Sequence, residues 1–161
     1  MKHASPEQRL TEWLAGPARA LSMDETLLTR RAWQARFVDP VAAPDKHARC
    51  LCKRPTAREN HFRGNTFDWH AFSFGGANMP ADLGAALGSL AAHPDKRVHG
   101  FVEDCTKPGV ETTFAALEDA VGTRGPLLLD VYFAPIDLRW TLAFTHEMRM
   151  GLGPYLVTAL A

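Results

Sequence analysis

The chain has 161 residues, of which 46% are hydrophobic and 22% are charged. This length and composition predict a single globular domain, residues 1–161, and argue against wholesale disorder. Eighteen basic residues balance eighteen acidic ones, so the net charge gives no sign of a nucleic-acid or membrane partner, and we expect neither. No run approaches the ~20 apolar residues of a membrane helix, the N-terminus lacks a secretory signal, and the odd number of cysteines, three, fits a reducing compartment. We therefore expect a cytoplasmic protein.

The N-terminal part carries two marked helix starts. Ser5-Pro6-Glu7-Gln8 combines a capping hydroxyl, a proline at the first helical position and a Gln three residues after the cap. Ser22-Met23-Asp24-Glu25 repeats the pattern with a Glu that can reach back to the cap. The first helix should end near Gly16 and the second near Val38.

A basic segment, residues 40–65, follows the second helix and is predicted to be a long loop or insertion. It has little apolar periodicity and many Lys and Arg side chains, among them Lys53, Arg54 and Arg58. These cations could contact phosphate or an acidic protein partner, or they could belong to an ordinary solvated loop. Of the two binding interpretations we favour the protein partner, with Lys53, Arg54 and Arg58 as candidate contacts.

No metal or cofactor is expected. Cys50 and Cys52 lie near His47 and His61, which invites a zinc interpretation. Structural zinc sites, however, usually space their cysteines by two to four residues and need four ligands. The sequence also contains no Gly-rich phosphate loop, nucleophile elbow or His-Glu-x-x-His motif.

The rest of the chain alternates between strand-like and helix-like segments, and this predicts the α+β class. We expect strands at 67–74, 97–103, 127–133, 140–146 and 155–160, and helices at 80–92 and from about 110 to 122. The order α-α-β-α-β-α-β-β implies a mixed sheet of about four to five strands with helices packed on it. Its C-terminal part should be an antiparallel hairpin of 127–133 with 140–146, which would make Trp140 a core residue.

The strand 140–146 ends in the strongest candidate site. Alternation places Trp140 and His146 on one face, and Thr145 and Glu147 on the other. At the end of the strand His146 could act as a general base or metal ligand, and Glu147 as an acid, base or orienting group. Alternatively, His146 and Thr145 hydrogen-bond the glycine turn that follows. We favour this structural role.

A second candidate lies in the strand 67–74, where Trp69 precedes His70. If this strand neighbours the C-terminal one, His70 could converge with His146 and Glu147 into a site of two histidines and one carboxylate. Core packing with one hydrogen-bonded polar group is the simpler interpretation.

Several short motifs together resemble a bacterial family of small proteins without an established activity. The motifs are Trp69-His70-Ala71-Phe72-Ser73, Asp130-Val131-Tyr132, Trp140-Thr141-Leu142-Ala143-Phe144-Thr145-His146-Glu147 and Gly153-Pro154-Tyr155. The chain departs from the pattern in its basic segment, in residues 148–152 and in Leu156. The resemblance implies a shared fold and a shared site, with Trp69, Thr145 and Tyr155 as candidate binding residues.

Two functional hypotheses follow. The first is a non-enzymatic binding protein with a protein partner, such as an immunity-type inhibitor that covers a toxin's active site. Small cytoplasmic immunity proteins are similar to this chain in size and composition, which is an analogy of class. The second is a small metal-dependent or general-base hydrolase that uses His146 and Glu147, with or without His70.

Overall fold

The structure is a computed structural model that describes residues 4–37, 82–91, 96–102, 107–150 and 154–158. The basic segment 40–65 and the expected strand 67–74 lie outside these residues.

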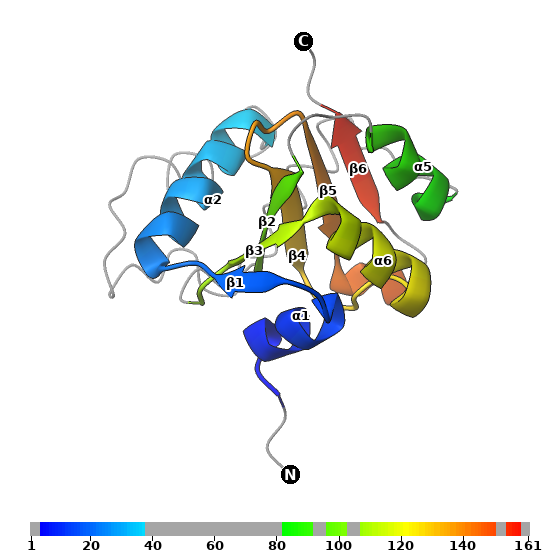
Figure 1. Cartoon of the computed structure of the whole chain (residues 1–161), viewed down its shortest axis with the longest axis horizontal. Coiled ribbons are helices and arrows are strands. Elements are labelled where there is room, and N and C mark those ends of the chain that lie inside the picture. Colours follow the sequence, from blue (N-terminus) through cyan, green and yellow to red (C-terminus); the bar gives the residue numbers. More distant parts are fainter. Residues whose placement is uncertain (1–3, 38–81, 92–95, 103–106, 151–153, 159–161) are drawn as a thin grey trace.

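The fold is α+β, as the sequence predicts, and is built on a six-stranded sheet in the order β1-β3-β2-β4-β5-β6 (Figure 1). Every pairing between the described strands is antiparallel, whereas we expected a mixed sheet of four to five strands. The short β1, Ala-Arg-Ala, lacks the run of apolar alternation that marks a strand in a sequence. The strands are β1 (Ala18–Ala20), β2 (Arg97–Val102), β3 (Val110–Thr113), β4 (Val131–Pro135), β5 (Trp140–Phe144) and β6 (Tyr155–Thr158).

Helices cover both faces of the sheet. Helices α1 (Pro6–Leu14), α5 (Leu83–Leu90) and α6 (Phe114–Arg124) contribute to one apolar cluster, and α2 (Met23–Phe37) contributes to a second. Figure 1 shows α2 to the left of the sheet and α5 and α6 to the right. Among the described residues, no helix has the length and apolar character needed to cross a membrane.

Both expected helix starts are confirmed. Ser5 accepts a hydrogen bond from the Gln8 amide, and the Gln8 side chain accepts one from the Ser5 amide, which forms a capping box. Ser22 and Glu25 make the same reciprocal pair at the start of α2, at 3.1 and 2.7 Å. The local sequence is enough to predict these helix starts because each capping pair joins two residues within a single helical turn.

The expected C-terminal hairpin is also confirmed. Strands β4 and β5 pair with Val131 opposite Phe144 and Phe133 opposite Leu142. Every residue of both strands is buried, and β2 and β6 flank the pair, so it is central in the sheet. Strand β4 begins at Val131, later than the expected 127, and extends through Pro135.

The expected helix from about 110 begins later than its apolar spacing suggests. Val110–Thr113 is strand β3, and α6 begins only at Phe114. Thr113 ends the strand and caps the helix, since its hydroxyl accepts a hydrogen bond from the Ala116 amide at 3.2 Å. The 3.6-residue spacing from Val110 is misleading because both elements bury their apolar side chains in the same core cluster.

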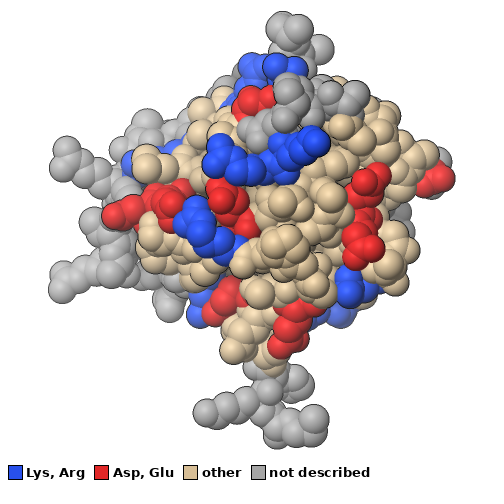
Figure 2. Space-filling view, viewed as in Figure 1, with Lys and Arg blue, Asp and Glu red and all other residues tan. Residues whose placement is uncertain are grey.

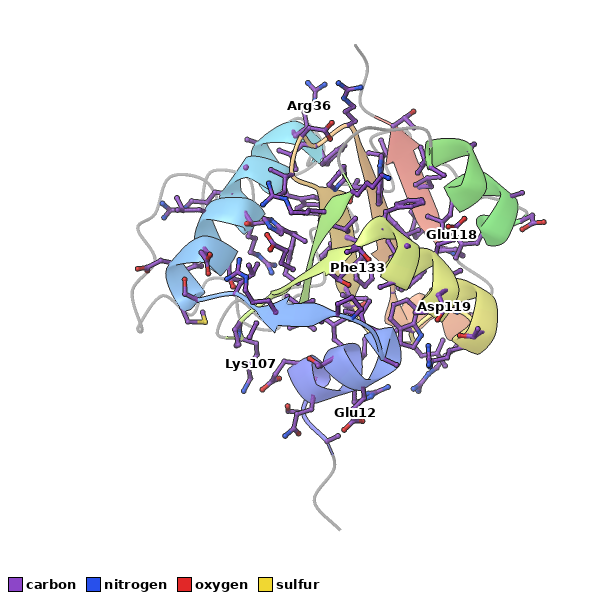
Figure 3. All side chains as sticks on the ribbon, in the orientation of Figure 1. Glu12, Arg36, Lys107, Glu118, Asp119 and Phe133 are labelled. Carbon is purple, nitrogen blue, oxygen red and sulfur yellow. The ribbon has the colours of Figure 1, made fainter. Side chains whose placement is uncertain are left out.

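Trp140 is a core residue, as expected. Its side chain is 1% exposed and meets the ring of Phe114 edge to face, with 5.8 Å between ring centroids. Around it the first cluster brings Trp13, Phe133 and Phe144 together. Figure 3 shows Phe133 in the interior, while Glu118 and Asp119 lie on the exposed outer side of α6. This face of the sheet is therefore an apolar core.

Candidate functional site

A row of polar side chains crosses three strands on the sheet face that α2 covers. Arg19 of β1 lies opposite Glu111 of β3, and Glu111 lies opposite His99 of β2. The next residue in the row, Ala134 of β4, belongs to the second apolar cluster. Thr29 of α2 joins the row from above the sheet through His99. We call Thr29, His99, Glu111 and Arg19 the polar row.

The hydrogen bonds along the polar row assign the tautomer of His99. Its Nε2 lies 3.1 Å from the Glu111 carboxylate, and its Nδ1 lies 3.1 Å from the Thr29 hydroxyl. A carboxylate can only accept, so in the neutral ring Nε2 carries the hydrogen and donates it to Glu111. Nδ1 then accepts from the Thr29 hydroxyl. The result is a hydroxyl–imidazole–carboxylate chain with a defined direction.

Arg19 connects this chain to the first turn of α2. Its guanidinium donates to both oxygens of Glu25, at 3.2 to 3.3 Å, and its Nε lies 3.6 Å from Glu111. The backbone hydrogen bond from Ser22, together with the side chain of Arg19, lowers the pKa of Glu25 to about 2. The hydrogen bond from His99, and then the charge of Arg19, lowers the pKa of Glu111 against the opposing effect of burial. Both glutamates are therefore carboxylates at neutral pH.

Two separate hollows lie beside the polar row. An open groove of about 380 Å³ lies over the ends of three strands and is lined by Pro17, Ala18, Arg19, Arg97, Glu111, Thr112 and Thr113. A smaller hollow of about 140 Å³ is lined by Thr29, Ala32, His99, Pro135, Ile136 and Leu138. The hydrogen bond between His99 and Glu111 joins the rims of the two hollows. Figure 2 shows that basic and acidic side chains alternate on the visible surface near β1 and α2.

The expected corner at His146 and Glu147 differs from the sequence prediction in its backbone. Strand β5 ends at Phe144, and residues His146–Met150 form a short 3-10 helix instead of the end of the strand. The Met148 amide donates to the Thr145 carbonyl at 3.1 Å, which turns the chain out of the sheet. The side chains of His146 and Glu147 lie outside the description, as does His70. The hydrolase site stays a prediction.

The candidate binding residues fall into two groups. Thr145 is fully buried, and Tyr155 is 6% exposed within the cluster around Trp33, so both side chains are placed in the interior. Their role in binding is untested. The remaining candidates lie outside the described residues: Trp69, Lys53, Arg54 and Arg58.

The alternation expected for β5 is confirmed as far as Phe144. Trp140, Leu142 and Phe144 belong to the cluster under α1, α5 and α6, whereas Ala143 belongs to the α2 side. Thr141 also faces α2, because its hydroxyl accepts from the Trp33 indole at 2.7 Å and donates to the Phe133 carbonyl at 2.9 Å.

The sequence analysis missed the polar row. A partial signal exists for His99, which is a polar residue among the apolar residues of β2, whereas Glu111 lies in the mostly polar strand β3. Their partnership depends on the register of three strands and on the placement of α2, which the sequence does not state. Within the described ranges, no three His, Cys, Asp or Glu side chains gather in a way that could hold a metal ion.

Comparisons with protein-family models, with curated proteins and with solved structures find no match to this chain. The candidate site is therefore argued from its own geometry.

Proposed function

We propose that this chain is a cytoplasmic binding protein that docks an acidic partner protein on the groove beside the polar row. The observation that carries the proposal is the open groove itself, which Arg19 and Arg97 line from two different strands. Arginine is enriched at protein interfaces, where its planar guanidinium makes several directed hydrogen bonds.

The charges around the groove favour an acidic partner. Lys96 and Arg97 are exposed at the start of β2, and the Arg19 side chain is 54% exposed. The carboxylates on this side, Glu25 and Glu111, already accept hydrogen bonds from within the domain. Counted together, Lys96, Arg97 and Arg19 bring three positive charges to this side against the two negative charges of Glu25 and Glu111, with which Arg19 is paired. Such a surface speeds the approach of an acidic partner and fixes its orientation.

An immunity-type inhibitor of a bacterial toxin is the specific form of this proposal. In this form the chain would cover the toxin's active site with polar side chains. The sequence also carries the basic segment, residues 40–65, with Lys53, Arg54 and Arg58 as further candidate contacts to an acidic partner. This form of the proposal rests on the analogy of class and on the charge of the groove.

The test is a comparison of two double variants that carry the same charge change. Arg19→Glu with Arg97→Glu reverses the groove, whereas Arg9→Glu with Arg124→Glu reverses two exposed arginines on α1 and α6. The tagged proteins are mixed with the product of the neighbouring gene and with the native lysate, and the association rate of any captured partner is measured at low and high salt. We expect the groove variant to slow association, mainly at low salt, and the control variant to behave like wild type. Equal effects of the two variants would contradict docking at the groove.

A further inference from the structure

The small hollow beside His99 has the dimensions of a receptor for one side chain. Its volume of about 140 Å³ is well below the roughly 300–1,000 Å³ of pockets that hold drug-sized ligands. It is formed by three separate elements: Thr29 and Ala32 of α2, His99 of β2, and the end of β4 with its following turn. A hollow of this size fits the kind of anchoring side chain that dominates binding energy at protein interfaces.

The polar row determines what this hollow requires of an occupant. In the neutral ring of His99, Glu111 holds the hydrogen on Nε2, so the Thr29 hydroxyl donates its own hydrogen to Nδ1. The Thr29 oxygen then retains only acceptor capacity. An occupant that excludes water from Thr29 should therefore bring a donor, which disfavours the acceptor-only carboxylates of Asp and Glu.

The remaining walls are apolar and held in place. Ala32, Pro135, Ile136 and Leu138 line the hollow beside Thr29 and His99. Leu138 has φ 54°, a left-handed conformation that is uncommon for a residue with a side chain of this size. Its amide donates to the Pro135 carbonyl at 3.0 Å, and the turn is further fixed by an Arg139–Asp137 ion pair at 2.8 Å. Apolar walls disfavour the strongly hydrated ammonium of lysine.

We propose that this hollow receives one tyrosine side chain of the partner, with the ring against the apolar walls and the phenol O–H donating to the Thr29 oxygen. Tyrosine joins an apolar ring to a donor at its tip, and the indole of tryptophan is larger. Tyrosine is also among the residues that most often anchor interfaces. The inference rests on the proposed function, because it names the anchor of the same partner.

The probe is 4-methylphenol, the side chain of tyrosine, compared with toluene and 4-methylanisole, which have no O–H to donate. Binding is followed at pH 8 by the methyl NMR signals of Ala32, Ile136 and Leu138. We expect 4-methylphenol to shift these signals and to bind roughly 2- to 10-fold more tightly than toluene, the ratio that one net hydrogen bond supplies. Equal binding of the three compounds, or no shift at these methyl groups, would overturn the proposal.

Two variants test whether the preference for 4-methylphenol arises from Thr29 and from this hollow. Thr29→Val should remove the preference for 4-methylphenol and leave toluene binding in place, whereas Ala32→Leu should fill the hollow and weaken both compounds. Thr123→Val is the matched control, because Thr123 is an exposed threonine on α6 whose hydroxyl bonds its own helix. A preference for 4-methylphenol that survives Thr29→Val would refute the assigned donor. These measurements need no partner. If 4-methylphenol does not bind in the hollow, only this inference is overturned. Docking at the groove is tested separately, by the charge-reversal variants.

Discussion

The sheet has two described faces that differ in how they are held. Under α1, α5 and α6, aromatic rings pack edge to face, as Trp13 does on Phe144 and Phe114 on Trp140. Under α2, rings also pack, as Trp33 does on Phe101, but buried side chains there add directed hydrogen bonds. Trp33 donates to Thr141, and the buried Arg30 donates to the Val102 carbonyl at 2.9 Å.

This difference has a physical consequence for each face. Apolar packing is roughly proportional to buried area and tolerates exchange between side chains of similar volume. A buried hydrogen bond specifies one partner and one orientation, and its loss leaves a polar group without water or a partner. The first face therefore holds the larger apolar cluster, whereas the hydrogen bonds of the second fix the position of α2 and with it the polar row.

The largest expected effect is on the apolar face. Trp140→Ala should lower the free energy of unfolding by about 3–5 kcal/mol, because a large buried aromatic leaves a cavity. Chemical denaturation measures the change, with Trp140→Phe as the milder control. Wild-type stability in Trp140→Ala would mean that this face does not hold the domain together.

A smaller effect is expected from the buried hydrogen bond on the α2 face. Thr141→Val keeps the shape of the side chain but removes the oxygen that accepts from Trp33 and donates to Phe133. The loss should cost about 1–3 kcal/mol in the free energy of unfolding. Thr123→Val, on the exposed side of α6, should stay within about 0.5 kcal/mol of wild type. If the two variants are equally stable, the hydrogen bonds of the α2 face add nothing to the free energy of unfolding beyond what packing supplies.

The smallest effect concerns acid stability, which we expect to be sensitive at the start of α2. The pKa of Glu25 is lowered from 4.5 to about 2 in the folded chain, first by the Ser22 backbone and then by Arg19. A lowered folded pKa contributes stability that is complete above the unfolded value and is lost as pH falls from about 4.5 towards 2. Glu25→Gln should therefore flatten the pH dependence of unfolding in this window. An unchanged slope would contradict this expectation and show that solvent screens the interactions of this exposed glutamate.

The sequence best predicts those structural features that depend on contacts between residues close together in the chain. Ser5 with Gln8 and Ser22 with Glu25 mark helix starts through contacts three residues apart. The β4–β5 hairpin is predictable because a short turn joins two apolar runs.

What the sequence does not show is set by distant contacts. Val110 continues a helical spacing but pairs with Gly100 in the sheet, because strand pairing there overrides local periodicity. Arg19 lies far from His99 and Glu111 in the chain, and all three come from different strands, so the residues around any one of them do not predict its two partners. Local pattern also placed His146 on a strand, although the chain leaves the sheet after Phe144.

We propose that the α2 side of the sheet, at the polar row, is the binding surface. The most direct test of this proposal is a backbone-amide NMR map of the isotope-labelled protein titrated with the captured partner. We expect the largest changes in amide signals to centre on Arg19, Arg97, His99 and Glu111 and to extend to Thr29. Changes centred instead on α1 and on Glu118 and Asp119 of α6, with the polar row unaffected, would contradict it.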